Sequence, residues 1–319
     1  MASMRLIESG SSACIYLSTT AEGNQEESAS ANAATLTWSN ALVAGGGFSD
    51  AANDSTCILK VFRPTASDIA AKAAREIDAL RRLQGTATSP GCPFVIGLYF
   101  VREFNLTPSL PVLGMEYCPL GDLLALSSDA NFVVEEPPFF SAELVLALDH
   151  LRKHGVLHGD IKPENVGVTA AGHLRLLDFG HAKVLEHQAT VVHESGTLPY
   201  ASPEVLTRSP CTLAADWWSL GAIIFELVFG KSAFRESTDE ETMERIMVHG
   251  PAWPSSQELL AHIPASDFIQ RLLAEDPAHR PSTRQACQAF SFFNGVDWAQ
   301  VAAEAWTPET FVLTPQRTE

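Results

Sequence analysis

Two carboxylates, a lysine and an amide lie close together in the middle of the chain, at spacings that suit phosphoryl transfer. Asp160, Lys162 and Asn165 belong to one run that begins at His158, and Asp178 follows in a Leu-Asp-Phe-Gly sequence. Carboxylate and amide oxygens are ligands that Mg²⁺ prefers, and an ammonium group can neutralise a phosphate. Each residue taken singly also fits a structural role, such as a core histidine or a helix cap. Their order and spacing together favour chemistry in which a base and metal ligands act on a phosphoryl group.

The run resembles the catalytic loop of protein kinases, and the Asp-Phe-Gly sequence resembles their metal-binding loop. The resemblance implies that Asp160 accepts the proton of the acceptor hydroxyl and that Lys162 contacts the transferred phosphate. It also implies that Asn165 and Asp178 are the metal ligands. The cofactors that follow from the resemblance are ATP and Mg²⁺.

Two segments before this loop supply a second pair of charges. Residues 57–62 form an apolar run that is too short for a helix and contains Lys60, which predicts a buried strand with one functional cation. A helix is predicted from a cap at Ser67 to about Leu83, with Glu76 on its apolar face. A buried carboxylate is costly unless it is paired, so we expect an ion pair with the lysine, as in the kinase pair that orients the α- and β-phosphates. The alternative is an amphipathic helix with one glutamate at its border.

The N-terminal residues predict two strands joined by a turn of small residues, over residues 6–17. This segment resembles the kinase loop that covers the ATP phosphates, with Glu8 at the first glycine of the pattern and Ala13 at the third. Small residues still allow the backbone to approach phosphate oxygens. A glycine cluster at residues 45–47 is a minor alternative, because it lies too close to Lys60 for two strands and a turn. The resemblance implies nucleotide contacts from Ile7, Gly10, Ser11, Ser12, Ala13 and Ile15.

A short apolar segment farther along the chain resembles the last strand of the kinase N-terminal lobe, followed by the hinge. The resemblance implies that Met115 is the gatekeeper residue and that the backbone of Glu116 and Cys118 bonds to adenine. Two positions that enclose adenine depart from the family together. Ile58 stands where a small alanine is usual, and Gly167 where a large aliphatic residue is usual. We therefore expect the nucleotide to lie slightly lower than in most kinases, and a Gly167→Leu substitution to weaken ATP binding.

The acceptor side of the resemblance indicates a protein substrate. Thr197 lies in a segment like the peptide-docking loop of Ser/Thr kinases, and together with Lys162 it favours serine or threonine acceptors over tyrosine. Asp122, Glu164 and Glu226 match acidic positions by which basophilic kinases bind arginines upstream of the acceptor. A substrate with basic residues near its acceptor is the resulting hypothesis.

Several residues are expected to support the site without taking part in catalysis. A long apolar-periodic helix over residues 139–154 would lead into the catalytic loop. A second helix, apolar nearly all round, is predicted from Asp216 to Gly230, and its first residue would brace that loop. By the same resemblance, Glu204 and Arg280 form a buried ion pair.

Gly159 is the main departure within the catalytic loop. Most kinases carry an arginine at this position, and that arginine normally pairs with a phosphorylated activation segment. We therefore predict that activity does not require phosphate on Thr190, Ser195 or Thr197.

The resemblance covers residues 4–298 and implies the α+β, bilobal protein kinase fold. A small antiparallel-sheet N-terminal lobe with one helix is expected over residues 4–117, with a low-complexity insertion at about 20–55. A larger, mostly helical C-terminal lobe would span 118–298, followed by a short tail over 299–319. Two segments, at residues 140–148 and 292–298, look most like the AGC group of Ser/Thr kinases.

Composition limits the remaining possibilities. The chain has 319 residues, 46% of them hydrophobic, and a formal net charge of −17. This charge argues against nucleic acid or anionic membranes as partners. No stretch approaches the roughly 18 apolar residues of a membrane span, and no leader is evident at the N-terminus. The six cysteines are scattered, without disulfide or zinc spacing. We expect a monomer inside the cell, in the cytoplasm, the nucleus or both.

Three functions remain open from the sequence. An active ATP-dependent Ser/Thr protein kinase is favoured because its charged site residues are all present. A pseudokinase scaffold or allosteric binding module with weak nucleotide binding is supported by the departures at Glu8, Ala13, Ile58 and Gly167. A small-molecule phosphotransferase on a related fold is opposed by the docking loop and by the Glu204–Arg280 pair.

Overall fold

The computed structural model describes residues 2–9, 12–20, 56–63, 68–85, 91–103, 110–127, 137–185, 189–193 and 196–305. Some predictions fall outside the described residues: those for Gly10, Ser11, Ser67 and Ser195, for the insertion beyond residue 20, for the glycine cluster at 45–47, and for the tail beyond residue 305. The described chain divides into two compact units. The first comprises Met1–Ile77 and Gly97–Tyr117, and the second comprises Asp78–Ile96 and Cys118–Glu319.

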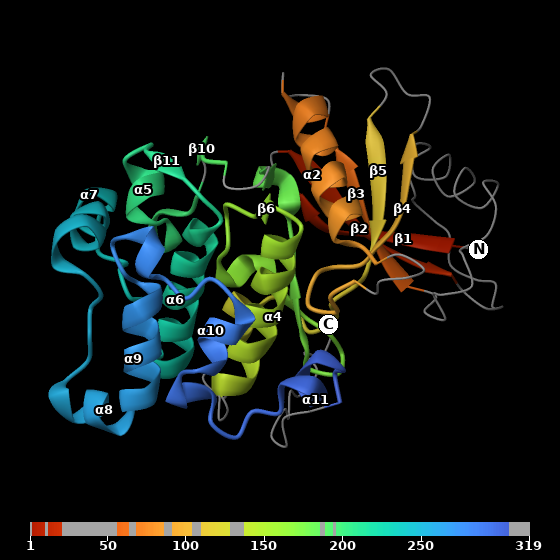
Figure 1. The fold of residues 1–319 in the computed structure, drawn as a ribbon. Coiled ribbons are helices and arrows are strands. Elements are labelled where there is room, and N and C mark those ends of the chain that lie inside the picture. The colour runs from red at the N-terminus through yellow and green to blue at the C-terminus, as the bar shows by residue number, and fades with distance from the viewer. Residues whose placement is uncertain are drawn as a thin grey trace. The chain divides into compact units, whose positions relative to one another are not determined.

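The first unit is built on a five-stranded antiparallel sheet with the order β1-β2-β3-β5-β4. One helix, α2 (Ile69–Leu83), contributes its residues up to Ile77 to this unit and lies beside the sheet in Figure 1. This composition agrees with the predicted N-terminal lobe. The strands are β1 (Ala2–Ser9), β2 (Ala13–Thr20), β3 (Thr56–Phe62), β4 (Leu98–Glu103) and β5 (Pro111–Met115).

The register of the central strands places several predicted site residues on one face of this sheet. Ile15 of β2 pairs with Lys60 of β3, and Ile58 of β3 pairs with Met115 of β5. Side chains two apart on a strand share a face, and so do directly paired residues. The sheet therefore presents the predicted phosphate-binding lysine and the residues expected around adenine on the same side.

The second unit is mostly helical within the described residues, as predicted for the C-terminal lobe. The long helix α6 (Ala214–Phe229) packs between α4 (Pro137–Lys153) and α9 (Ile263–Leu272), as Figure 1 shows. Every residue from Ala214 to Phe225 is buried, which explains why this helix is apolar nearly all round. Shorter helices surround these three: α3 (Leu123–Ser127), α5 (Pro203–Leu206), α7 (Asp239–Glu244), α8 (Ser256–Ala261), α10 (Arg284–Gln288) and α11 (Trp298–Ala302).

Three short two-stranded ladders connect the helices of the second unit and carry its loops. The pairs are β6 (Val156–Leu157) with β9 (Lys183–Val184), β7 (Val166–Val168) with β8 (Leu174–Leu176), and β10 (Val191–Val192) with β11 (Pro210–Cys211). The unit also includes residues 78–96, which the sequence assigns to the N-terminal lobe. They group here because the backbone of Leu176 exchanges hydrogen bonds with Phe94 and Ile96, and because His150 bonds to the carbonyl of Leu83.

The helix limits differ slightly from the predicted ones. The helix predicted over 139–154 begins earlier, at Pro137, because proline suits the first turn of a helix. The helix predicted from Asp216 begins at Ala214 and ends at Phe229, directly before the predicted stop at Gly230, which caps it with a left-handed φ of 65°.

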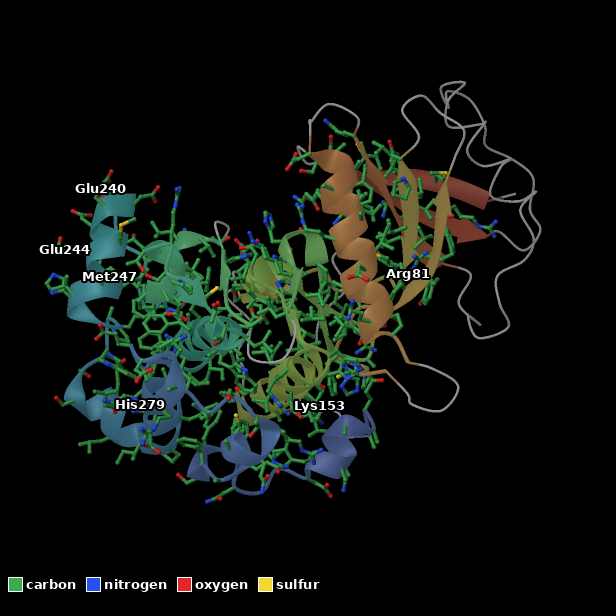
Figure 2. The ribbon with its side chains drawn as sticks, turned by 45° about the horizontal axis from the view of Figure 1, so that its top comes forward. Arg81, Lys153, Glu240, Glu244, Met247 and His279 are labelled. Atoms are coloured by element: carbon green, nitrogen blue, oxygen red, sulfur yellow. The ribbon has the colours of Figure 1, made fainter. Side chains whose placement is uncertain are left out.

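Helix α7 and the π-helical turn that follows it, Arg245–His249, have a buried side and a charged, partly apolar outer side. Thr242 and Ile246 are buried, whereas Glu240, Glu244 and Met247 are exposed, and Figure 2 shows these three on the outer surface of the unit. Among the described residues, no helix is long and apolar enough to cross a membrane.

Candidate active site

The start of the catalytic loop is fixed by one buried carboxylate. Asp216, near the beginning of α6, accepts hydrogen bonds from the backbone N–H of His158 at 2.8 Å and of Gly159 at 2.9 Å. Its side chain is buried, and burial raises the pKa of this carboxyl above its ordinary value. The bracing contact expected from the sequence is therefore present.

The imidazole of His158 connects this loop to the segment that carries Asp178. Its Nε2 lies 2.8 Å from the carbonyl oxygen of Leu177, and its Nδ1 accepts a hydrogen bond from the backbone N–H of Asp160 at 3.3 Å. The first contact uses an N–H on Nε2, and the second uses a lone pair on Nδ1. It packs against the ring of Phe179, with 4.8 Å between the ring centroids.

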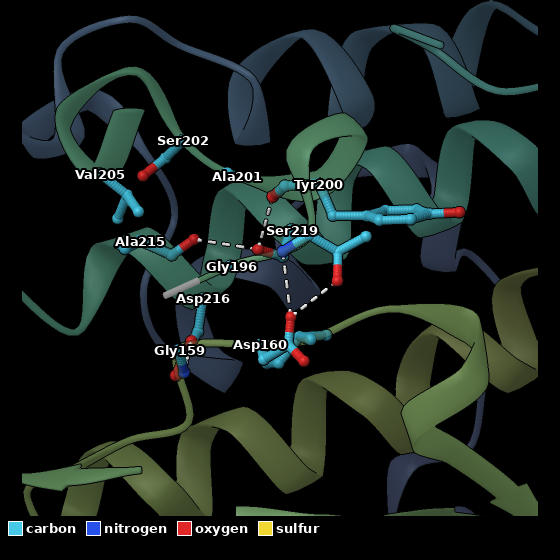
Figure 3. A pocket seen from close by; sticks show the side chains of 12 residues that line it. Gly159, Asp160, Gly196, Tyr200, Ala201, Ser202, Val205, Ala215, Asp216 and Ser219 are labelled. Atoms are coloured by element: carbon cyan, nitrogen blue, oxygen red, sulfur yellow. Dashed lines mark hydrogen bonds between the residues drawn. The ribbon is translucent and has the colours of Figure 1, made fainter. Parts of the chain in front are cut away.

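Asp160 lies at the centre of a hydrogen-bonded cluster of predicted catalytic residues. Its Oδ1 accepts from the backbone N–H of Thr197 at 3.0 Å and from the hydroxyl of the same residue at 2.9 Å. Nζ of Lys162 lies 3.1 Å from Oδ2 of Asp160 and donates to the Thr197 hydroxyl at 2.8 Å. Figure 3 shows this carboxylate at a small pocket, with the two bonds to it as dashed lines. Thr197, 37 residues from the aspartate in sequence, is thus held directly on the candidate base.

The cluster keeps Asp160 ionised. Burial alone would raise its pKa, but the charge of Lys162 and the hydrogen bonds from Lys162 and Thr197 outweigh burial and lower the pKa below its ordinary value. A carboxylate in this state can accept a proton at neutral pH.

Asn165 and Asp178, the predicted metal ligands, flank the paired strands β7 and β8: Asn165 directly precedes β7, and Asp178 follows shortly after β8. Nδ2 of Asn165 donates to the backbone oxygen of Asp160 at 2.7 Å and to its Oδ2 at 3.3 Å, so Oδ1 is the atom that would bind a metal. The backbone oxygen of Asn165 accepts from the N–H of Leu177 at 2.8 Å, which holds the asparagine beside the residue that precedes Asp178. Oδ1 of Asp178 accepts from Gly180 N–H at 3.2 Å. Mg²⁺ is commonly bound by one or two carboxylates together with substrate phosphates, and this donor set fits that pattern.

The predicted lysine–glutamate pair forms within the first unit. Nζ of Lys60 in β3 lies 2.6 Å from Oε1 of Glu76 in α2. The two side chains are 10% and 1% exposed, so the carboxylate is a buried partner and not a glutamate at the border of an amphipathic helix. The ion pair fixes the ammonium group on the face of the sheet that also carries Ile58 and Met115.

The other predicted nucleotide contacts are divided between the units. In the first unit, Ile7 is exposed beside a bulge of β1, Ser12 accepts from Lys72 at 3.4 Å, and Ala13 is buried. The backbone N–H of Glu116 donates to the carbonyl of Gly97 at 2.9 Å. Of the predicted set, the second unit holds Cys118, Asp122, Glu164 and Gly167.

Gly167 is closely surrounded within the second unit. A Cβ at this position would lie 2.8 Å from Sγ of Cys118 and 2.9 Å from Cδ1 of Leu177. Any side chain here would therefore have to displace the ends of these two neighbouring side chains. The lower position of the nucleotide stays a prediction.

The three predicted acidic specificity residues have different surroundings. Asp122 caps α3, because its Oδ1 accepts from the N–H of Ala125 at 2.8 Å. Oε2 of Glu164 is buried and has no hydrogen-bond partner among the described residues. Both carboxylate oxygens of Glu226 lie 3.1 Å from the hydroxyl of Tyr200, and burial raises the pKa of this glutamate.

One residue beside the catalytic loop belongs to no motif and was not predicted from the sequence. His193 is 1% exposed, and its Nε2 lies 3.0 Å from the carbonyl oxygen of Gly159. The only signal in the sequence is indirect, because Gly159 stands where an arginine is usual.

An antiparallel sheet with one helix, a mostly helical second unit, and these two charged clusters together define the protein kinase class. The profile of the protein kinase domain matches residues 47–292. This chain belongs to the protein kinase family. It is 33% identical over 217 residues to ribosomal protein S6 kinase alpha-3 of Homo sapiens and of Mus musculus, which covers 65% of this chain and 28% of theirs. It is 32% identical over 246 residues to 3-phosphoinositide-dependent protein kinase 1 of Arabidopsis thaliana, which covers 70% of this chain and 49% of the relative. These relatives confirm the predicted resemblance to AGC-group Ser/Thr kinases, although the chain spans less than half of their length.

Proposed function

We propose that this chain is an ATP-dependent Ser/Thr protein kinase that transfers the γ-phosphate of Mg-ATP to protein hydroxyls. The observation that carries the proposal is the cluster of Asp160, Lys162 and Thr197, in which an ionised carboxylate, a cation and the docking-loop threonine lie within 3.1 Å of one another. A scaffold without catalysis would not need these groups in mutual contact.

The geometry suggests a role for each group. Asp160 would accept the proton of a substrate hydroxyl, since its lowered pKa keeps it ionised at neutral pH. Lys162 would neutralise charge on the transferred group, and Thr197 would hold the carboxylate in position. Bound Mg-ATP would supply the phosphoryl group and the metal charge that stabilises its transfer. Asn165 and Asp178 would hold the metal, and Lys60, oriented by its glutamate partner, would bind phosphate oxygens.

The direct test is transfer of label from ATP. Purified protein incubated with Mg²⁺, γ-labelled ATP and a basic acceptor protein should label serine or threonine residues. Asp160→Asn and Asp178→Asn should each lower the rate on the order of 10²-fold or more. Asp239→Asn, an exposed aspartate at the start of α7, is the matched control and should not change the rate. Nucleotide binding without transfer would refute the proposal in favour of a pseudokinase.

We further propose a preference for basic residues upstream of the acceptor. The support comes from two carboxylates, Glu164 and Glu226. Burial raises the pKa of Glu226, and repulsion from the negative charge of Glu164 raises it further. A substrate guanidinium would donate to the buried Oε2 of Glu164, which lacks a partner among the described residues.

A positional-scanning peptide library tests this preference. Arginine or lysine should be enriched before the acceptor, and Glu164→Gln or Glu226→Gln should reduce that enrichment. Glu240→Gln, on the outer side of α7, is the control. An unbiased library profile for the unaltered protein would reject the basophilic assignment.

Activity is proposed to be independent of phosphate on the activation segment, defined here as residues 178–204. Gly159 provides no guanidinium to pair with a phosphate, and the hydroxyl of Thr197 is already bonded to Asp160 and Lys162. Protein treated with phosphatase, and shown by intact mass to carry no phosphate, should keep its activity. A large loss on this treatment would overturn the proposal.

The extent and setting of the domain complete the proposal. A catalytic domain over residues 4–298 is consistent with the matched range 47–292 and with α11, which begins at Trp298. Residues 299–319 would form a short tail. We propose a monomer that acts in the cytoplasm, the nucleus or both; light scattering after size-exclusion chromatography and fractionation of cells test the two statements.

A further inference from the structure

Gly159 and His193 occupy one site in the second unit. Gly159 has a φ of +77°, a conformation that residues with a side chain rarely adopt. A Cβ on this glycine would overlap with Nε2 and Cε1 of the His193 ring. The imidazole thus fills the space that any side chain at position 159 would enter. Its Nε2 also lies 3.0 Å from the Gly159 carbonyl oxygen.

Backbone contacts bring the histidine to this place. Val191 and Val192 form β10, which pairs with Cys211 and Pro210 of β11. Nζ of Lys183 donates to the carbonyl of Val192 at 2.9 Å, and the thiol of Cys211 donates to the carbonyl of Val191 at 3.1 Å. These contacts secure residues 191–192. The contact from His193 to Gly159 is the next one along the chain, and it joins the activation segment to the residue directly before the candidate base.

We propose that His193 is a positioning residue that holds the activation segment on the catalytic loop, in place of the usual contact between an arginine and a phosphorylated residue. The inference rests on the proposed kinase function and extends it. It explains how the segment could be ordered without phosphate, since the hydrogen bond needs no modification. It also explains why glycine stands at position 159, because an arginine there would displace the imidazole.

The protonation state of the histidine is part of the arrangement. The bond to a carbonyl requires an N–H on Nε2, while Nδ1 is buried without a hydrogen-bond partner among the described residues. Burial lowers the pKa of His193 below 6.5, and nearby Lys183 and His158 lower it further, whereas the Gly159 carbonyl and Asp160 act in the opposite direction. The neutral ring is therefore the state that makes the contact. Acid favours its release, because the released ring binds a proton more readily than the held one.

Substitutions at His193 separate its hydrogen bond from its bulk. His193→Ala removes the donor, and kcat should fall about tenfold, the factor expected for one buried hydrogen bond, with little change in KM for ATP. His193→Gln keeps an Nε2–H and should retain most of the activity. Val192→Ala is the matched control, since this neighbouring side chain is 44% exposed. A value of kcat for His193→Ala equal to that of the unaltered protein, or equal losses in the alanine and glutamine variants, would overturn the proposal.

The pH profile provides a readout that loss of folding would not mimic. Between about pH 7.5 and about pH 5.5, kcat of the unaltered protein should fall more steeply than kcat of His193→Gln, which cannot be protonated in this range. Identical profiles would count against the proposal.

Hydrogen exchange measures the anchoring without any need for activity. Amides of residues 189–193 and 196–200 should exchange faster in His193→Ala than in the unaltered protein or in His193→Gln. Gly159→Ala should produce the same loosening by displacing the ring, and adding His193→Ala to it should cause little more. Unchanged exchange in His193→Ala would refute the anchoring. If the unaltered protein transfers no phosphate but exchange behaves as described, the kinase proposal fails and the anchoring role of His193 stands.

Discussion

The ion pair between Glu204 and Arg280 allows a quantitative prediction about the second unit. Nη1 of the arginine lies 2.6 Å from Oε1 of the glutamate, and Nη2 lies 3.0 Å from Oε2, which is the bidentate arrangement. The arginine side chain is fully buried and the glutamate side chain is 10% exposed. Glu204→Gln would leave a buried guanidinium without its counter-charge. We expect the free energy of unfolding to fall by about 3 to 5 kcal/mol.

The arginine should be the more sensitive partner, because it does more than neutralise the carboxylate. It also donates to the carbonyls of Ala214 at 3.0 Å, Ala274 at 2.9 Å and Glu275 at 3.2 Å. Arg280→Leu would remove a donor from each of these acceptors, at about 1 to 3 kcal/mol for each one that is left without a partner. This loss adds to that of the ion pair, so Arg280→Leu should be more destabilising than a substitution of the glutamate.

Urea denaturation followed by tryptophan fluorescence measures these effects. Trp218 is 3% exposed, and its ring centroid lies 5.2 Å from the guanidinium carbon of Arg280, so its environment reports on this region. The control is Asp78→Asn, which breaks an exposed ion pair with Arg82 at 3.3 Å and should change stability by less than about 1 kcal/mol. If Glu204→Gln unfolds within about 1 kcal/mol of the unaltered protein, the reasoning from the buried charge is wrong.

Three further predictions concern the candidate site. Lys60→Met removes the cation paired with a buried glutamate, and kcat/KM should fall on the order of 10²- to 10³-fold in steady-state assays; a loss below about tenfold would speak against its role. Lys162→Ala removes the charge that offsets the burial of Asp160, so the pKa of that carboxyl should rise. The acid limb of the pH profile of kcat/KM should then move to higher pH. An acid limb at unchanged pH would contradict the role of Lys162 in lowering this pKa. Gly167→Ala should lower the free energy of unfolding by about 1 to 3 kcal/mol through overpacking, and Cys118→Ala should recover part of the loss; no recovery would show that the thiol is not the clashing group.

The catalytic loop could be predicted because its residues are near one another in sequence. Asp160, Lys162 and Asn165 are brought together by one loop and one short turn, so their spacing alone indicates shared chemistry. The pairing of Lys60 with Glu76 was also within reach, because strand and helix periodicity identify a buried cation and a buried anion that need each other.

The surroundings of Gly167 could not be predicted in this way. A glycine at a position that usually carries a large side chain suggests empty space. Protein interiors are close-packed, however, and neighbouring chain segments fill such space. Cys118 and Leu177 do so here, and neither residue carries a motif that reveals it. The surroundings of the acidic residues could not be predicted from the sequence either. Asp122 caps a helix, whereas Glu164 has a buried oxygen without a partner among the described residues.

The sequence by itself determined which chemical groups suited to phosphoryl transfer this protein carries, and which helices and strands carry them, because motifs and periodicity act over short distances along the chain. It also showed that an arginine is missing beside the candidate base. Only the tertiary structure decided what replaces that arginine. His193 reaches Gly159 because β10 pairs with β11 and because the glycine has no side chain to exclude the ring. Contacts of this kind depend on how distant segments pack, and no local pattern in the sequence encodes them.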